Sequence, residues 1–183
     1  MYGSMKFKIH NFIKKYKYPA SVSGIALLSF FLSVLCWNLE PTVSRDGVLY
    51  LELVQIWHDQ GDFQAVLEHW PRFWIPPLPL YLIKLLMDCG LSAEAAGVGL
   101  NIAMGCCLPV IVYGIAMEIT HERKIALCSG LLMALNPSMI ELAIEVQRDV
   151  IYLFFCGLLI YFLVCGIRRK NWFYWGFAGG GFS

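Results

Sequence analysis

The chain has 183 residues, of which 58% are hydrophobic, 15% aromatic and 15% charged. Soluble domains carry about 25% charged residues, so this composition indicates a protein that sits in a membrane. The formal net charge of +1 excludes the strongly basic surface that a nucleic-acid partner would require.

The first predicted element is a membrane-spanning helix over residues 20–39, preceded by five lysines between Lys6 and Lys17. A basic segment before an apolar one is also the pattern of a secretory signal. Here the apolar stretch is longer than an ordinary signal core, and the residues from Trp37 to Glu40 lack the small side chains of a cleavage site. We therefore predict an uncleaved membrane anchor.

A long loop over residues 40–94 follows and is rich in charged side chains. Residues 44–57 have the periodicity of an amphipathic helix, with Ser44 as a suitable N-cap and Gly61 as its end. Asp46 falls in the first turn, where a carboxylate suits the positive end of the helix dipole. The sequence thus predicts a helix that presents a carboxylate at its amino end.

Two features predict that this loop follows the membrane surface. One face of the predicted helix runs from Asp46 to the aromatic ring of Tyr50, one turn further on. Residues 76–90 are apolar, but they are shorter than a crossing requires and contain Lys84 and Asp88. They are therefore expected to form an interfacial helix instead of a span.

The rest of the chain is almost continuously apolar. Further spans are predicted over residues 95–119, 125–142 and 150–167, because about 20 apolar residues cross a hydrocarbon core of about 30 Å. A last apolar segment, residues 172–183, opens with aromatic residues typical of a membrane interface. We expect residues 1–183 to form a single membrane domain that is incomplete at its carboxyl end. The predicted fold is all-α, a polytopic transmembrane helix bundle with an extracytoplasmic loop of interfacial helices.

The basic residues set the predicted orientation. The amino-terminal lysines, the pair Arg123-Lys124 and the cluster Arg168 to Lys170 together hold ten of the 14 lysines and arginines. With residues 76–90 at the interface, all three groups fall on one side of the membrane. The positive-inside rule then predicts a cytoplasmic amino terminus in the plasma or inner membrane, and places residues 40–94 outside.

A second outside loop precedes the span that begins at residue 150. It carries Glu145, Arg148 and Asp149, on the same predicted side as Asp46. An arginine matches a phosphate with two hydrogen bonds, and a carboxylate can act as a general base. Each motif alone also has a plainer reading, Asp46 as a helix-end charge and Arg148-Asp149 as a surface ion pair that contributes little.

Other residue types indicate structural roles. Six of the seven cysteines lie inside apolar runs, and no CxxC pair with distant histidines occurs, so neither a disulfide scaffold nor a zinc site is predicted. Tyr113, Tyr152 and Tyr161 are expected to pack inside the bundle.

The order of the motifs resembles a known superfamily. A first span is followed by Ser44-Arg45-Asp46-Gly47 with Tyr50, an aromatic-Pro-Pro element ending at Pro77, Asn136-Pro137, and Glu145 to Asp149 with Tyr152. This order resembles the GT-C superfamily of membrane glycosyltransferases, closest to bacterial relatives of protein O-mannosyltransferases and aminoarabinose transferases. The resemblance covers essentially the whole chain but only the amino-terminal portion of that fold.

The resemblance implies a sugar donor linked to polyprenyl or dolichyl phosphate, and a protein, lipid or glycan as acceptor. It implies that Asp46 is the catalytic residue that accepts the acceptor's proton. Some relatives use a divalent metal, whereas the O-mannosyltransferase-like branch does not require one. Six-coordinate oxygen ligation does not follow from this sequence, so no cofactor is assigned and a divalent metal stays an open, unsupported alternative. The residues expected to bind the substrate are Arg45, Tyr50, Glu145, Arg148 and Asp149.

Two alternatives from other classes remain. A small polytopic transporter subunit would show charges or broken helices near the middle of the membrane, and these spans show almost no charges. A non-catalytic membrane scaffold would bind a partner through the outside loop and would not depend on Asp46.

Overall fold

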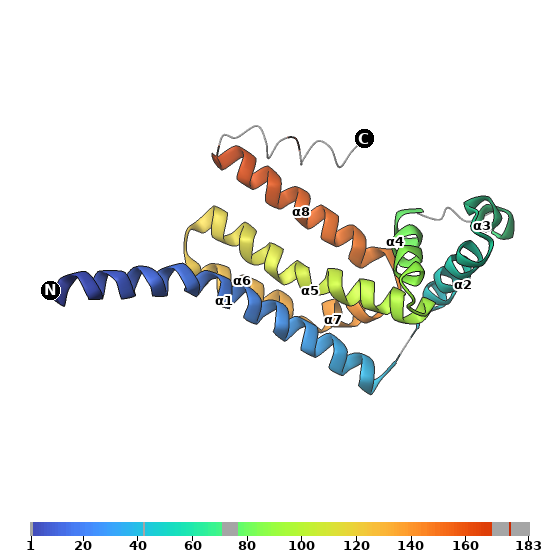
Figure 1. The fold of residues 1–183 in the computed structure, drawn as a ribbon, viewed down its shortest axis with the longest axis horizontal. Coiled ribbons are helices and arrows are strands. Elements are labelled where there is room, and N and C mark those ends of the chain that lie inside the picture. Colours follow the sequence, from blue (N-terminus) through green and yellow to red (C-terminus); the bar gives the residue numbers. More distant parts are fainter. Residues whose placement is uncertain (1, 42, 71–76, 170–175, 177–183) are drawn as a thin grey trace.

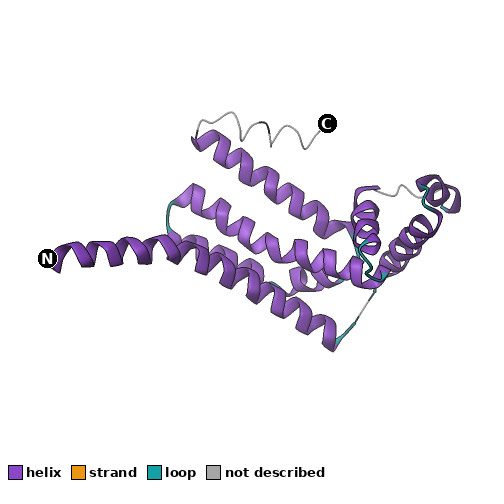
Figure 2. Ribbon diagram, viewed as in Figure 1, coloured by secondary structure: helices purple, strands orange, loops and turns teal. Residues whose placement is uncertain are grey.

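The computed structural model describes residues 2–41, 43–70, 77–169 and 176, and the side chains from residue 20 onward. In these residues every regular element is an α-helix, which confirms the predicted all-α class (Figures 1 and 2). The helices are α1 (Tyr2–Leu39), α2 (Arg45–Gln60), α3 (Phe63–His69), α4 (Pro77–Asp88), α5 (Ala93–Thr120), α6 (Arg123–Ala134), α7 (Pro137–Ile144) and α8 (Arg148–Arg169).

Three helices are long and apolar enough to cross a membrane: Ala20–Leu39 of α1, α5 and α8. Figure 1 shows them running side by side, with the carboxyl end of α1 and the amino ends of α5 and α8 at the end of the bundle where α2, α3 and α4 lie. We call this the α2 end. The predicted segment 172–183 lies outside the described residues, apart from residue 176.

The segment 125–142, predicted as one span, consists of two helices, α6 and α7, bent by 54° at the break between them. Pro137 lacks an N–H and disfavours helical geometry at the preceding residue, so the helix ends before it. Asn136 then starts α7, its side chain accepting a hydrogen bond from the Ser138 amide at 3.1 Å. At 1.5 Å per residue α6 is only about 18 Å long, so a crossing requires both helices.

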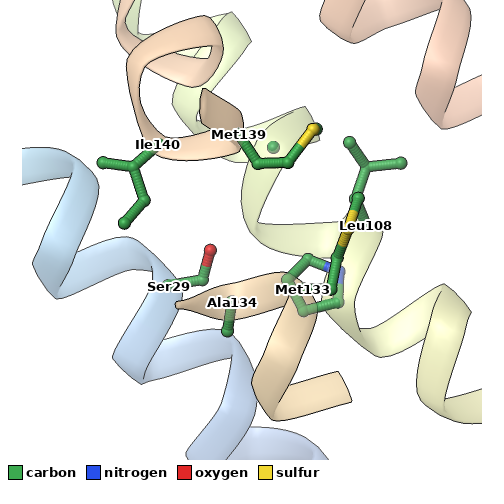
Figure 3. A pocket seen from close by; sticks show the side chains of 8 residues that line it. Ser29, Leu108, Met133, Ala134, Met139 and Ile140 are labelled. Atoms are coloured by element: carbon green, nitrogen blue, oxygen red, sulfur yellow. The ribbon is translucent and has the colours of Figure 1, made fainter. Parts of the chain in front are cut away.

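The break encloses a small cavity of about 10 Å³, lined by Ser29, Met133 and Met139 among others (Figure 3). A site of this size holds at most one water molecule. The α6–α7 pair is therefore closely packed in spite of its bend.

Helices α2, α3 and α4 form a layer across the α2 end. Their shared core consists of side chains that are almost fully buried: Leu53, Val54, Val66, Leu80 and Ile83. Gly61 ends α2 in the left-handed conformation, as its position predicted, with its N–H donating to the Trp57 carbonyl. The 12 residues of α4 are too few for a crossing, and the helix packs against α2 and α5.

Two histidines, His58 half-buried and His69 exposed, link the three helices of this layer. His58 Nδ1 of α2 lies 3.0 Å from Asp88 Oδ1 of α4, and His69 Nε2 of α3 lies 3.2 Å from Glu52 Oε1 of α2. Lys84 also donates to Asp88 at 2.8 Å, and the hydrogen bonds of Asp88 with Lys84 first, and then with His58, lower the pKa of Asp88. Because Asp88, His69 and Glu52 are exposed and Lys84 and His58 are only half-buried, the pairs orient the helices more than they stabilise them.

Candidate active site

The amino end of α2 is built as its sequence predicted. Ser44 is the N-cap, and its Oγ accepts a hydrogen bond from the Gly47 amide at 3.1 Å. Arg45 and Asp46 follow in the first turn, and both side chains are exposed. The Asp46 carboxylate therefore lies at the positive end of the α2 dipole and in contact with solvent.

The second loop is held by a residue deep in α5. Asn101 is 1% exposed, and its Nδ2 donates to the carbonyl oxygens of Glu145 and, at 3.0 Å, of Gln147. These carbonyls belong to the short non-helical connection between α7 and α8. The hydrogen bonds satisfy the buried amide of Asn101 together with two carbonyls of this connection, and they fix the point at which α8 begins.

This connection packs directly against the amino end of α2. Gln147 Nε2 donates to Ser44 Oγ at 3.1 Å and to Glu145 Oε2 at 2.5 Å. A Cβ atom on Gly47 would lie only 3.0 Å from the Val146 carbonyl oxygen, so glycine permits the close approach. The amino ends of α2 and α8, about a hundred residues apart in sequence, therefore meet at one place.

Tyr50 lies between the two helix ends. Its side chain is 4% exposed, and this burial is the main reason that its pKa is raised. The positive charge of Arg148 acts in the opposite direction, while Asp46, Asp149 and Tyr152 raise the pKa further. The Tyr50 hydroxyl is thus neutral at physiological pH and within electrostatic reach of charges from both helices.

We refer to Arg45, Asp46, Tyr50, Arg148 and Asp149 as the α2–α8 cluster. Its two arginines and two aspartates are exposed, and none of them makes a side-chain hydrogen bond or ion pair with another described residue. Free guanidinium groups beside two helix amino ends form a suitable environment for an anion. The aspartates supply proton acceptors at the same place.

Glu145, the remaining predicted site residue, differs from the exposed charged residues of the α2–α8 cluster because its side chain has a hydrogen-bond partner. Glu145 is half-buried, and its carboxylate accepts the hydrogen bond from Gln147, so it helps to hold the loop.

Tyr152 was expected inside the bundle and is instead 55% exposed, because it lies one turn after the exposed start of α8. Among the described residues, no group of three or more His, Cys, Asp or Glu side chains is placed to hold a metal ion.

Sequence reasoning missed Asn101. A single buried asparagine in an apolar span is itself a signal, since a polar side chain at that depth must find partners. Its partners are backbone carbonyls 44 and 46 residues away, which no local pattern indicates.

A larger groove of about 390 Å³ lies between α1, α5 and α8, towards the opposite end of the bundle. Its walls are mostly apolar, and its one carboxylate, Glu118, is paired with Arg169. With this charge already compensated, the groove lacks the free polar groups of the α2–α8 cluster and is not the candidate active site.

Comparison with known families gives one match. A family model described as dolichyl-phosphate-mannose-protein mannosyltransferase matches residues 75–183. This range includes Asn101, Arg148 and Asp149, whereas Arg45, Asp46 and Tyr50 precede it. Searches of curated proteins and of solved structures found no match.

Proposed function

The chain belongs to the family of dolichyl-phosphate-mannose-protein mannosyltransferases, which are membrane glycosyltransferases, and on this premise we propose its donor, its acceptor side and its catalytic residue. The donor is a sugar linked to a polyprenyl or dolichyl phosphate. The acceptor is a hydroxyl or amine of a protein, lipid or glycan at the non-cytoplasmic face. The observation that carries this proposal is the joining of the amino ends of α2 and α8, each of which bears an exposed arginine and an exposed aspartate.

The proposed reaction is a direct displacement at the anomeric carbon. The acceptor oxygen or nitrogen attacks this carbon and gives its proton to the Asp46 carboxylate. The bond between the anomeric carbon and the phosphate oxygen breaks, and the lipid phosphate leaves with the bonding electrons. Arg148, with Arg45, stabilises the charge that develops on the phosphate, and Asp149 orients the acceptor. The neutral Tyr50 hydroxyl supplies a donor between these groups.

The donor class is tested with membranes of the native host, prepared with and without the gene. Radiolabelled dolichyl-phosphate mannose and GDP-mannose are supplied separately, with formation of new lipid-phosphate sugar blocked in the second case. We expect the gene to be needed for release of label from the lipid donor, and no transfer from the nucleotide sugar. Gene-dependent transfer directly from GDP-mannose would contradict the proposed donor.

The proposed side of the membrane follows from the charged ends of the helices. Arg123 bonds Ser21 near the start of the first span, and Arg169 bonds Glu118 near the end of α5, so the basic groups gather opposite the α2 end. The positive-inside rule makes their end cytoplasmic and the α2–α8 cluster non-cytoplasmic.

This orientation is measured by labelling single cysteines in a cysteine-free background. Gln60→Cys lies at the end of α2 and Glu122→Cys before α6, and both positions are exposed. A membrane-impermeant maleimide is expected to label the first variant in intact cells and the second only after permeabilisation. The reverse pattern, or equal labelling of both in intact cells, is incompatible with the proposed topology.

One observation favours a transporter as the second candidate function. The bent α6–α7 pair is a broken helix, a feature of transport sites. However, the cavity at this break is only about 10 Å³ and is lined by no ionisable side chain. A substrate site needs more room and polar partners, so this cavity does not support transport at the break.

A further inference from the structure

Asn101 has an unusual position in this fold. It lies on α5, one of the helices that span the membrane, and is 1% exposed. The side-chain amide carries two N–H groups, and two carbonyls, those of Glu145 and Gln147, accept from Nδ2. Because Asn101 is almost fully buried, few other partners are available to its side-chain amide.

The contacts continue from Asn101 to the α2–α8 cluster. Fixing the Gln147 backbone places its side chain, which donates to Ser44 Oγ, the cap of α2. The intervening Val146 carbonyl packs against Gly47, next to Asp46. On the other side, Gln147 is followed at once by Arg148 and Asp149. Asn101 thus binds the connection that contacts the α2 part of the cluster on one side and leads directly into the α8 part on the other.

We propose that Asn101 is a positioning residue for sugar transfer: it holds residues 145–147 so that Arg148 and Asp149 face Asp46. This inference rests on the proposed function. Asn101 touches neither donor nor acceptor and acts only through the connection it binds. Displacement of a reacting group by about 1 Å can lower the rate about 100-fold, so a fixed connection is needed for catalysis.

The decisive variant is Asn101→Asp, which keeps the size of the side chain but replaces the N–H donors by a carboxylate facing two carbonyl oxygens. The matched control is Asn38→Asp, because Asn38 Nδ2 also donates to a backbone carbonyl, that of Val34, at 2.7 Å, but Asn38 is exposed and has no contact with the cluster. Gln147→Met provides a second test, since it removes only the contacts with Ser44 and Glu145.

The readout independent of activity is the distance between α2 and α8. Spin labels are placed at Gln60→Cys and at the native Cys156, both exposed, with the other six cysteines replaced. Pulsed electron resonance of the full protein in nanodiscs should give one narrow distance for the parent and for Asn38→Asp. Asn101→Asp and Gln147→Met should broaden or shift it at temperatures well below the melting temperature of each variant.

Activity is then measured on unlabelled forms of the same variants. We expect kcat/KM for the lipid-linked donor to fall about 100-fold in Asn101→Asp and to stay within a few fold in Asn38→Asp. If the parent lacks transfer while the distance still changes, the proposed function fails and the structural role of Asn101 stands. If the parent is active and Asn101→Asp keeps both the parental distance and the parental rate, the positioning role is overturned. If Asn101→Asp does not fold, an unchanged distance in Gln147→Met overturns it.

Discussion

Asp46→Asn is expected to reduce sugar transfer by about 1,000-fold, within the range of about 100- to 10,000-fold that a general base contributes. The amide has nearly the size of the carboxylate but does not accept the acceptor's proton. Asp46 is exposed and has no hydrogen bond or ion pair with another described residue, so the substitution leaves the fold intact. Insertion into the membrane and binding of lipid phosphate should therefore stay close to the parental level.

The measurement is donor turnover in host membranes that contain equal amounts of parent and variant. Asp59→Asn is the matched control, because Asp59 is also exposed on α2 but accepts a hydrogen bond from Gln55 Nε2 at 2.9 Å. It should keep parental activity. Transfer within a few fold of the parent in Asp46→Asn would remove Asp46 from the role of base.

Arg148→Gln is expected to weaken the binding of dolichyl phosphate about 10- to 100-fold, because a hydrogen bond to a charged group contributes about 1.5–3 kcal/mol. Arg148 is exposed and has no ion-pair partner among the described residues, so its charge is available to a ligand. Its removal also takes away the charge that lowers the pKa of Tyr50, so this pKa should rise further. The Tyr50 hydroxyl consequently stays neutral in the variant.

Binding is measured with dolichyl phosphate added to the purified protein in nanodiscs of neutral lipid. Arg168→Gln is the control, because Arg168 is equally exposed but lies at the other end of α8. We expect little change there. Equal losses in the two variants would mean that the lipid phosphate responds to general positive charge and does not bind at the α2–α8 cluster.

Much of the fold was predictable because its determinants are local. Apolar length predicts three of the spans, and Ser44 and Gly61 mark the two ends of α2 by their ordinary capping preferences. The length of an apolar segment does not indicate whether its helix is bent, so residues 125–142 are predicted as one span. The signal in the sequence is Pro137, which stands within the predicted span at the point where the helix breaks.

The candidate site was less accessible to sequence reasoning. The charged residues of both loops were identifiable by type and by predicted side. The contact between the two loops, however, depends on Asn101, Gln147 and Gly47. Each acts through a contact with backbone or side chain on a distant element, such as Gln147 with Ser44, 103 residues away. Such contacts follow from packing in three dimensions, which periodicity along one chain does not report.

The most direct test is a cryo-electron microscopy map of the native protein in nanodiscs with dolichyl phosphate bound. We expect phosphate density within hydrogen-bond distance of the Arg148 guanidinium and beside the amino end of α2, with the Asp46 carboxylate free to face an acceptor. Phosphate density at the opposite end of the bundle, near Arg168 and Arg169, or a map in which α2 and α8 do not meet, would contradict it.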